Sequence, residues 1–342
     1  MVAVFLLLAG GGIAFVLGGV VPAVQGIFAP DEVADYAGEG EGEVLVVVSS
    51  GDTGTTIGEM LEAEGVVKSS QAFYNAVIGR SPEPVFQPGT YSVAEKMSAA
   101  AALDRLLDPE SRVQDTVVIP EGTTVSGILT LIAESTEIPL ADLEAAAADY
   151  GSYGLPADAP SLEGYLFPAT YQFEPGTTAR DAIQQLVTRQ FQALDQAGVP
   201  EADRNRVLTL ASIIQKEARE EEDFYKVSRV FTNRLEQGML LQSDATVAYG
   251  VSTTGRVSTT DAERADQNPY NTYINEGLPV GPISNPGDVA IKAAVAPADG
   301  PWLFFVTVNT LTGETKFSET FAEHEAAVEE WQQFMRDNPG NE

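Results

Sequence analysis

Cysteine is absent from this chain of 342 residues, and histidine occurs once, as His324. Without thiols, the chain has no disulfides, thiolate zinc sites, iron–sulfur clusters or thiol nucleophiles. A single imidazole excludes a metal site built from several histidines, and a serine triad would have to use His324. Bond-cleaving chemistry in this protein therefore has to use carboxylates, hydroxyls, amides or lysine.

Basic residues are also scarce: 19 Lys and Arg stand against 50 Asp and Glu, for a formal charge of −31. A chain this acidic does not follow a phosphate backbone, so we expect no nucleic-acid partner. Hydrophobic residues make up 44% of the chain, which is enough for a packed core and excludes wholesale disorder. The length predicts two domains.

The first 30 residues carry no charged side chain. Val2 to Phe28 is long enough to cross a hydrocarbon core of ~30 Å as a helix. The alternative is a cleaved signal peptide, but the stretch is longer than a typical signal core and lacks a basic start. We predict a transmembrane anchor over 1–30 and an acidic, glycine-rich linker over 31–42. The positive-inside rule gives no orientation, because the first basic residue is Lys68.

Beyond the linker, hydrophobic periodicity predicts two α+β regions. The first has strands at 43–48 and 88–93, and helices at 56–65, within 66–80 and at 98–107. The pattern restarts near Arg112, with strands at 115–119 and 301–306, and helices at 124–134, 140–150, 178–197, 201–221 and 320–337. Between 242 and 288 the chain is rich in Asn, Thr, Tyr, Gly and Pro, which is typical of loops.

Glu217 is the most informative acidic residue. Val207, Leu210, Ala211 and Ile214 recur at helical spacing, and Glu217 lies on the same apolar stripe of the 201–221 helix. One interpretation is a structural carboxylate paired with Lys or Arg. The other is a desolvated carboxylic acid whose pKa is raised, which can donate a proton to a leaving group. The acidic run 220–223 is interpreted as a solvated helix end.

The loop-rich region concentrates side chains that a sugar-binding cleft needs. Aromatic rings stack on the apolar face of a sugar, and amides and carboxylates hold its hydroxyls. A well-capped structural loop has the same composition, so both interpretations stay open. The candidate substrate-binding residues are Gln242, Asp244, Thr246, Tyr249, Tyr270, Asn271 and Tyr273.

Several segments also resemble the MltG (YceG-like) endolytic murein transglycosylases. They are 162–168 (LEGYLFP), 211–218 (ASIIQKEA), 230–235 (VFTNRL), 241–250 (LQSDATVAYG), and 270–283, which contains YNTY, GLP and GPI. The resemblance implies a single-pass cell-membrane protein with its body outside the cytoplasm, a LysM-like subdomain at 43–108 and a catalytic domain at 109–342. It implies cleavage of peptidoglycan strands between N-acetylmuramic acid and N-acetylglucosamine, leaving 1,6-anhydro ends. The implied partners are glycan strands, the cytoplasmic membrane and cell-wall synthases.

The family's catalytic glutamate aligns with Glu217. Gln215 stands where the family pattern has another acid, which leaves Glu217 as the general acid. Ala245 replaces a usual proline and Ala169 a frequent aspartate, so no role of that aspartate carries over. A lytic transglycosylase works with one carboxyl: the acid protonates the glycosidic oxygen and then takes a proton from the sugar's own C6 hydroxyl. This chemistry requires no metal and no other cofactor.

Alternatives remain. One alternative is a catalytically silent scaffold that binds peptidoglycan, but the intact motif around Glu217 argues against it. A hydrolase could use Glu217 with Asp244 as its second carboxylate, and only the product separates it from a lyase. The 43–108 subdomain could bind glycan or act as a spacer. For His324 we expect a packing or capping role.

Overall fold

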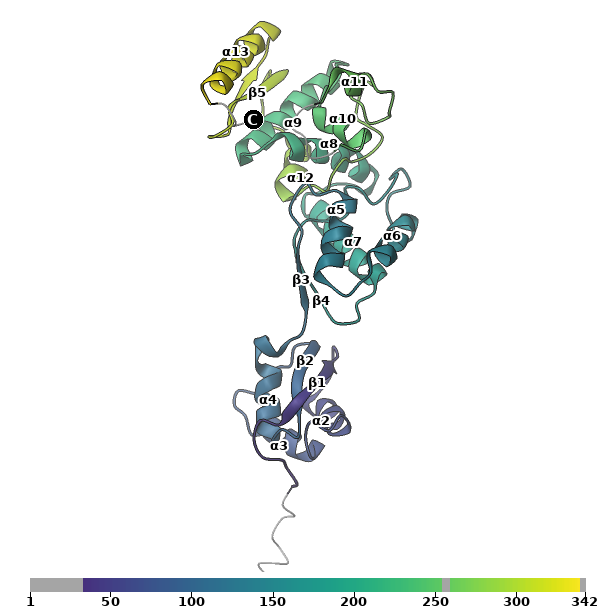
Figure 1. Ribbon diagram of the computed structural model, residues 1–342, viewed down its shortest axis with the longest axis vertical. Helices are drawn as coiled ribbons and strands as arrows, with labels where there is room; N and C mark the ends of the chain where they lie inside the picture. The colour runs from purple at the N-terminus through teal and green to yellow at the C-terminus, as the bar shows by residue number, and fades with distance from the viewer. Residues whose placement is uncertain (1–32, 254–258, 339–342) are drawn as a thin grey trace, which may run out of the picture. The chain divides into compact units, whose positions relative to one another are not determined.

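The computed structural model describes residues 33–253 and 259–338, which form two compact units with their boundary in the chain between Val113 and Gln114 (Figure 1). Helices are combined with small antiparallel strand pairs, which confirms the α+β class. The predicted anchor over 1–30 lies outside the described residues. Within those residues, no helix combines the length and apolar character needed to cross a membrane.

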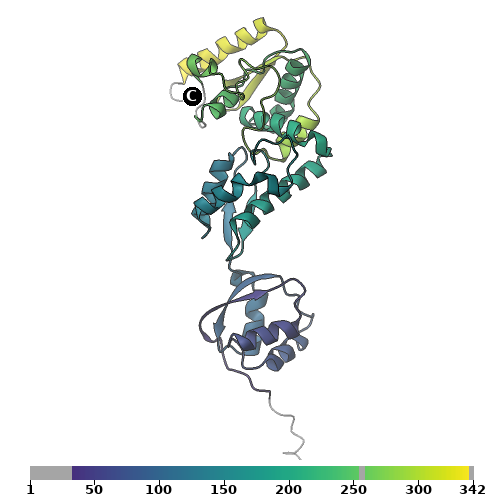
Figure 2. The ribbon, with the colours of Figure 1, turned by 90° about the vertical axis from the view of Figure 1, so that its right-hand side faces the viewer.

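The first unit packs helices against one strand pair (Figures 1 and 2). Its elements are β1 (Glu41–Val48), α2 (Gly54–Ala63), α3 (Ser70–Ile78), β2 (Gly89–Glu95) and α4 (Ala99–Leu107). Val46 lies opposite Tyr91 in the antiparallel register. Val46 and Val48 are buried while Leu45 and Val47 are exposed, as the twofold repeat of a strand requires.

The described part of the predicted linker is packed rather than extended away from the unit. The Ala99 backbone N–H, at the start of α4, donates to the Asp35 carboxylate at 3.0 Å. The Ser98 backbone N–H donates to the Gly38 carbonyl at 2.9 Å. A carboxylate at a helix N-terminus is favourable because the unpaired amides carry partial positive charge. The ordered unit therefore begins before β1.

The second unit begins with a strand pair and three helices. They are β3 (Asp115–Val118), α5 (Val125–Ser135), α6 (Leu140–Ala148), β4 (Thr170–Phe173) and α7 (Ala179–Gln196). Val117 lies opposite Tyr171 across the antiparallel pair. Thr124 and Thr178 cap α5 and α7 by accepting backbone N–H bonds of the first turn. This half of the unit has its own hydrophobic core.

The expected helix over 201–221 is wrong at both ends. A 3₁₀ turn occupies Glu201–Asp203, α8 runs over Arg204–Glu217, and Ala218 is extended. A separate helix, α9 (Glu221–Glu236), starts inside the acidic run that was interpreted as a helix end. Acidic side chains in a first turn stabilise a helix, so the run marks a start instead. The break leaves Glu217 as the last residue of α8.

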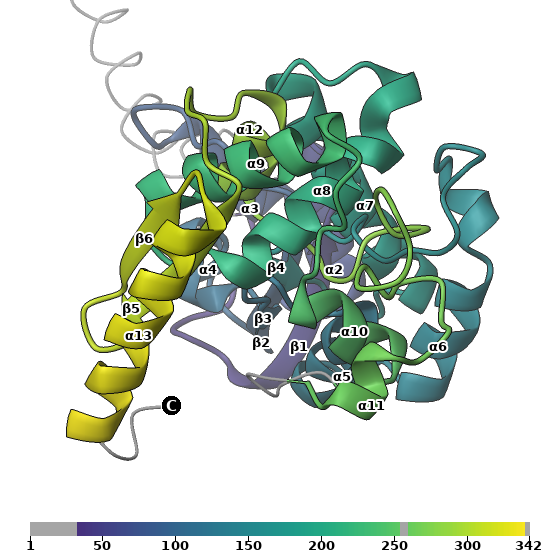
Figure 3. The ribbon, with the colours of Figure 1, turned by 90° about the horizontal axis from the view of Figure 1, so that it is seen from above.

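The remaining elements surround α8 and α9 (Figure 3). They are α10 (Asp244–Gly250), α11 (Asp261–Arg264), α12 (Asp288–Val295), the hairpin β5 (Phe304–Asn309) and β6 (Glu314–Ser318), and α13 (Phe321–Asp337). The short helices α10 and α11 lie in the stretch expected to be loops. The hairpin pairs Val306 with Lys316 and is covered by α13. The predicted strand at 301–306 and the terminal helix are confirmed, although β5 begins at Phe304.

Candidate active site

Glu217 lines a cavity of about 470 Å³ in the second unit. Its helix, α8, is buried along most of its length, so the carboxyl is carried by one of the most firmly packed elements of the molecule. The cavity is also lined by Asp244, Tyr249, Thr124, Lys216, Arg219, Ala245, Ala248, Ile283, Phe305, Val306, Thr307, Thr310 and Trp331. The volume falls within the range of about 300–1,000 Å³ that is usual for ligand sites.

The environment of Glu217 favours its protonated form. Burial is the main cause of its raised pKa, and the charge of Asp244 adds to the shift. The Ser243 hydroxyl donates to Glu217 Oε1 at 2.6 Å, and this bond acts in the opposite direction by stabilising the carboxylate. The cations Arg234 and Lys216 also lower the pKa. The result is a carboxylic acid with a raised pKa, facing a cavity.

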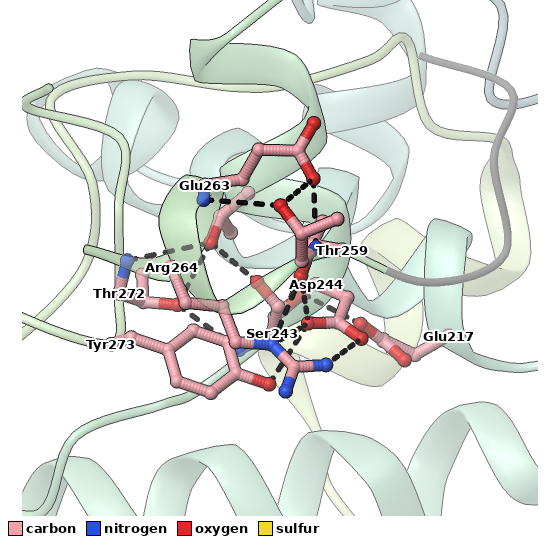
Figure 4. A network of polar contacts seen from close by, with 10 residues as sticks. Glu217, Ser243, Asp244, Thr259, Glu263, Arg264, Thr272 and Tyr273 are labelled. Carbon is pink, nitrogen blue, oxygen red and sulfur yellow. Dashed lines mark hydrogen bonds and ion pairs between the residues drawn. The ribbon is translucent and has the colours of Figure 1, made fainter. Parts of the chain in front are cut away.

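Asp244 has a very different environment, although it follows Ser243 directly (Figure 4). Its Oδ1 accepts hydrogen bonds from the Thr259 hydroxyl at 2.6 Å and from the Tyr273 hydroxyl at 2.9 Å. Arg264 donates to both carboxylate oxygens, each at 3.1 Å. Paired donors from a guanidinium hold a carboxylate in one orientation. Asp244 is therefore a fixed negative charge near Glu217.

The predicted substrate-binding residues separate into distinct groups. Asp244 and Tyr249 line the cavity with Glu217. Tyr270 stands against Tyr249, with ring centroids 4.8 Å apart, and does not line the cavity. Gln242 is exposed at a turn with a φ of 52°. The Tyr273 hydroxyl donates a hydrogen bond to the Asp244 carboxylate.

Asn271 and Thr246 have no exposed surface from which to contact a substrate. Asn271 Nδ2 donates to the carbonyls of Arg264 and Asp266 at 2.9 and 2.8 Å, and its Oδ1 accepts the Tyr273 backbone N–H. The Thr246 hydroxyl donates to the Ser243 carbonyl at 2.7 Å. We therefore assign both to the scaffold: they position the groups that hold Asp244 and Glu217.

Sequence reasoning missed Glu163, which lies in the LEGYLFP segment and is 4% exposed. Its carboxylate accepts bonds from the Val125 backbone N–H, from Asn285 Nδ2 at 2.9 Å, and from the Tyr249 hydroxyl at 3.1 Å. Burial nevertheless raises its pKa from 4.5 to about 7. Through Tyr249 this second buried acid is in contact with the cavity wall. The LEGYLFP motif itself was the available signal for Glu163, because it contains this acid.

Arg234, in the VFTNRL segment, was also missed. It is 8% exposed and donates to the Leu241 carbonyl at 2.8 Å and to the Leu303 carbonyl at 2.7 Å. The adjacent Asn233 donates to the Trp302 carbonyl at 2.8 Å. These bonds connect α9 to the loop that carries Ser243 and to the start of the β5–β6 hairpin. The segment therefore joins two walls of the cavity.

Two residues set aside at the sequence level have structural contacts. Gln215 Oε1 accepts the Gly287 backbone N–H at 2.9 Å. His324 stacks on Phe304, with ring centroids 5.3 Å apart, which confirms the packing role. Across residues 33–253 and 259–338, no group of three or more acidic or histidine side chains is placed to hold a metal ion.

The raised pKa of Glu163 predicts a pH dependence of stability. The unfolded chain ionises this carboxyl at about 4.5 and the folded chain at about 7, so the free energy of unfolding falls as pH rises between these values. The shift corresponds to about 3 kcal/mol. Glu163→Gln removes the ionisable group. We expect the free energy of unfolding of this variant to fall less than that of the unmodified protein between about pH 4.5 and 7, by about 3 kcal/mol.

Denaturant unfolding followed by tryptophan fluorescence measures this effect, because both tryptophans, Trp302 and Trp331, lie in the same unit as Glu163. Glu144→Gln, which removes an exposed carboxyl of that unit, is the control and should keep the slope of the unmodified protein. An unchanged slope in Glu163→Gln would contradict the assignment.

Comparison with known proteins places this site in a family. The model of the YceG-like family matches residues 46–330. An endolytic murein transglycosylase from Bacillus subtilis (strain 168) is 32% identical over 310 residues, which cover 84% of each chain. One from Streptococcus pneumoniae serotype 2 is 29% identical over 325 residues, 84% of this chain and 58% of that protein. The crystal structure of a yceG-like protein from Listeria monocytogenes aligns with a TM-score of 0.54 at 28% identity, over 83% of this chain and 98% of that one. The matches span most of the chain, which therefore belongs to the YceG-like family.

Proposed function

We propose that this protein is an endolytic peptidoglycan transglycosylase, with Glu217 as its catalytic acid and base. The observation that carries the proposal is a carboxyl of raised pKa, held by the Ser243 hydroxyl and facing a cavity of ligand size. The relatives named endolytic murein transglycosylases support the same activity. The substrate is a glycan strand, cut internally between N-acetylmuramic acid and N-acetylglucosamine.

The reaction needs two proton transfers at one group. Protonated Glu217 gives its proton to the glycosidic oxygen as the bond from that oxygen to C1 breaks. The resulting carboxylate then accepts the proton of the C6 hydroxyl of the same muramic acid, while O6 bonds to C1. The products are a 1,6-anhydro end and a free hydroxyl on the leaving sugar. Because water is not consumed, the enzyme is a lyase.

Asp244 supports this reaction through its fixed charge. The transition state has positive, oxocarbenium-like character at C1, and a preoriented negative group stabilises it without reorganisation. A hydrolase would instead need a second carboxylate to activate water. Both oxygens of Asp244 are already engaged by Arg264, and Oδ1 also accepts bonds from Thr259 and Tyr273. This arrangement favours the lyase over the hydrolase.

We further propose that residues 1–30 anchor the protein in the cytoplasmic membrane, with both units outside the cytoplasm and within reach of cell-wall synthases. Support comes from the uncharged sequence of this stretch and from the position of the substrate, since peptidoglycan lies outside that membrane. An anchored enzyme meets newly made strands before they are crosslinked. Cleavage there ends strand elongation.

For the first unit we propose a LysM-like role in holding glycan strands. Its core is separate from those of the second unit, so it is suited to act as a distinct binding module. Tyr74 and Ile78 on α3 are 40% and 60% exposed. They offer an aromatic and an apolar side chain to the faces of sugar rings. The alternative remains a spacer.

Substitution of Glu217 tests the catalytic acid. Glu217→Gln keeps the shape of the side chain and removes the proton, so we expect folding to survive and activity to fall by about 10⁴-fold, the upper part of the usual range for acid–base catalysis. Gln215→Ala is the control and should cost much less. The assay is release of 1,6-anhydro-muropeptides from uncrosslinked strands. Near-native activity in a folded Glu217→Gln would contradict the mechanism.

Ser243→Ala tests the same carboxyl through its pKa. Loss of the hydroxyl removes a bond that stabilises the carboxylate, so the pKa of Glu217 should rise further. The basic limb of kcat/KM against pH should then move to higher pH. A shift to lower pH, or none, would show that this carboxyl is not the titrating acid.

Removal of 43–108 should weaken binding to long glycan strands more than it lowers the rate of cleavage. Binding is measured by sedimentation with uncrosslinked strands, and cleavage by the release assay. Unchanged binding would identify the unit as a spacer.

A further prediction concerns the anchor. The full-length protein should fractionate with membranes and keep residues 1–30, as read by mass spectrometry of the intact chain. Recovery of most of the protein in the released fraction, starting near residue 24, would support a signal peptide instead.

A further inference from the structure

The cavity that contains Glu217 has a second wall of different chemistry. One side is built from α8 and α10, which carry the carboxyls. The other side comes from the C-terminal hairpin and helix, through Phe305, Val306, Thr307, Thr310 and Trp331. This wall brings apolar and hydroxyl groups to the catalytic carboxyl from a segment about a hundred residues further along the chain.

Trp331 is the notable member of this wall. It lies one turn after Ala327, the residue of α13 that is buried, so the two share the face of the helix that packs on the hairpin. Its side chain is nevertheless 36% exposed. Among the described residues, Trp302 packs on Phe317 and Phe304 on Phe321, whereas Trp331 makes no such ring contact. The indole is therefore held beside the cavity without being used in the core.

The wall is held firmly relative to Glu217. Phe305 packs edge-on against Phe231 of α9, with ring centroids 5.9 Å apart. Arg234 and Asn233, also on α9, donate to backbone carbonyls at the start of the hairpin. Since α9 packs directly against α8, the indole and the catalytic carboxyl belong to one packed framework.

We propose that Trp331 forms a saccharide subsite of the catalytic cavity, in which the indole stacks on a pyranose ring of the glycan strand next to the bond that is cleaved. This rests on the proposed function. A pyranose ring presents C–H groups on its face, which pack on an aromatic face, and hydroxyls at its edge. Thr307 and Arg219, which line the same cavity, provide a hydroxyl and a cation for polar groups of the strand. Trp331 lies one residue beyond the stretch matched by the family model, so the subsite is a property read from this chain.

Kinetics of Trp331 variants test the subsite. For Trp331→Ala we expect KM for uncrosslinked strands to rise roughly 3- to 10-fold, the size typical of an aromatic stacking contact, with kcat within about twofold. Trp331→Phe should recover part of the loss because it keeps an aromatic face. Gln332→Ala, the neighbouring exposed residue on α13, is the control and should leave KM unchanged. An unchanged KM in a folded Trp331→Ala would overturn the proposal, as would a fall in kcat that follows the loss of thermal stability.

A binding measurement gives a direct readout. In the Trp302→Phe, Glu217→Gln double variant Trp331 is the sole tryptophan of the chain, and the strands are not consumed. We expect a saturable change in its fluorescence on titration with uncrosslinked strands. No change at concentrations where sedimentation shows the protein fully bound would overturn the subsite.

The two proposals fail in different ways. If the unmodified protein releases no anhydro ends but the Trp331 fluorescence of the double variant still saturates with strands, the proposed function fails, and Trp331 remains a saccharide-binding residue without a cleaved bond beside it. If the unmodified protein cleaves strands and Trp331 variants behave like the Gln332→Ala control, the subsite fails and the function stands.

Discussion

The second unit depends on one buried guanidinium. Arg234 is 8% exposed and extends from α9 to the carbonyls of Leu241 and Leu303. The first contact holds the loop that leads to Ser243, and the second holds the start of the β5–β6 hairpin. Burying a cation destabilises the folded state unless its N–H groups are hydrogen-bonded. The carbonyls of Leu241 and Leu303 therefore have to stay in place around Arg234. The same charge lowers the pKa of Glu217, so the residue that holds the walls together also acts on the acid.

The site separates two carboxyls by environment. Glu217 is desolvated, which favours its protonated form, while the hydroxyl of Ser243 that donates to it acts in the opposite direction. Asp244 has Arg264 and two hydroxyl donors, which fix its orientation. Opposite environments for neighbouring acids are a general way to assign them different roles at one pH. The buried Asn271 contributes indirectly, because its amide orients both Arg264 and Tyr273.

The cavity joins these acids to a surface suited to a sugar chain. The carboxyl wall comes from the packed helices α8 and α10, and the aromatic wall from the C-terminal hairpin and α13. A third acid, Glu163, lies behind Tyr249 and is kept there by Val125 and Asn285. Its burial lowers stability near neutral pH. Rigid walls suit an extended substrate that must be held on both sides of one bond.

The α+β class, most helices and strands, and Glu217 as the leading acid could be predicted from the amino-acid sequence, because periodicity, capping residues and motif spacing are local. The sequence predicted Asp244 and Tyr249 as substrate-binding residues, and the structure shows that both line the cavity with Glu217. The folded structure was needed to show that Asn271 and Thr246 are buried scaffold, and that a helix starts in the acidic run at 220–223. Likewise Glu163, Arg234 and Trp331 gain their roles from partners that lie far away in the chain, and no local pattern contains those contacts. Burial and long-range hydrogen bonds depend on how distant segments of the chain pack. The same residue types could therefore belong to an exposed loop or to a functional site, and only the packing of the folded chain distinguishes the two.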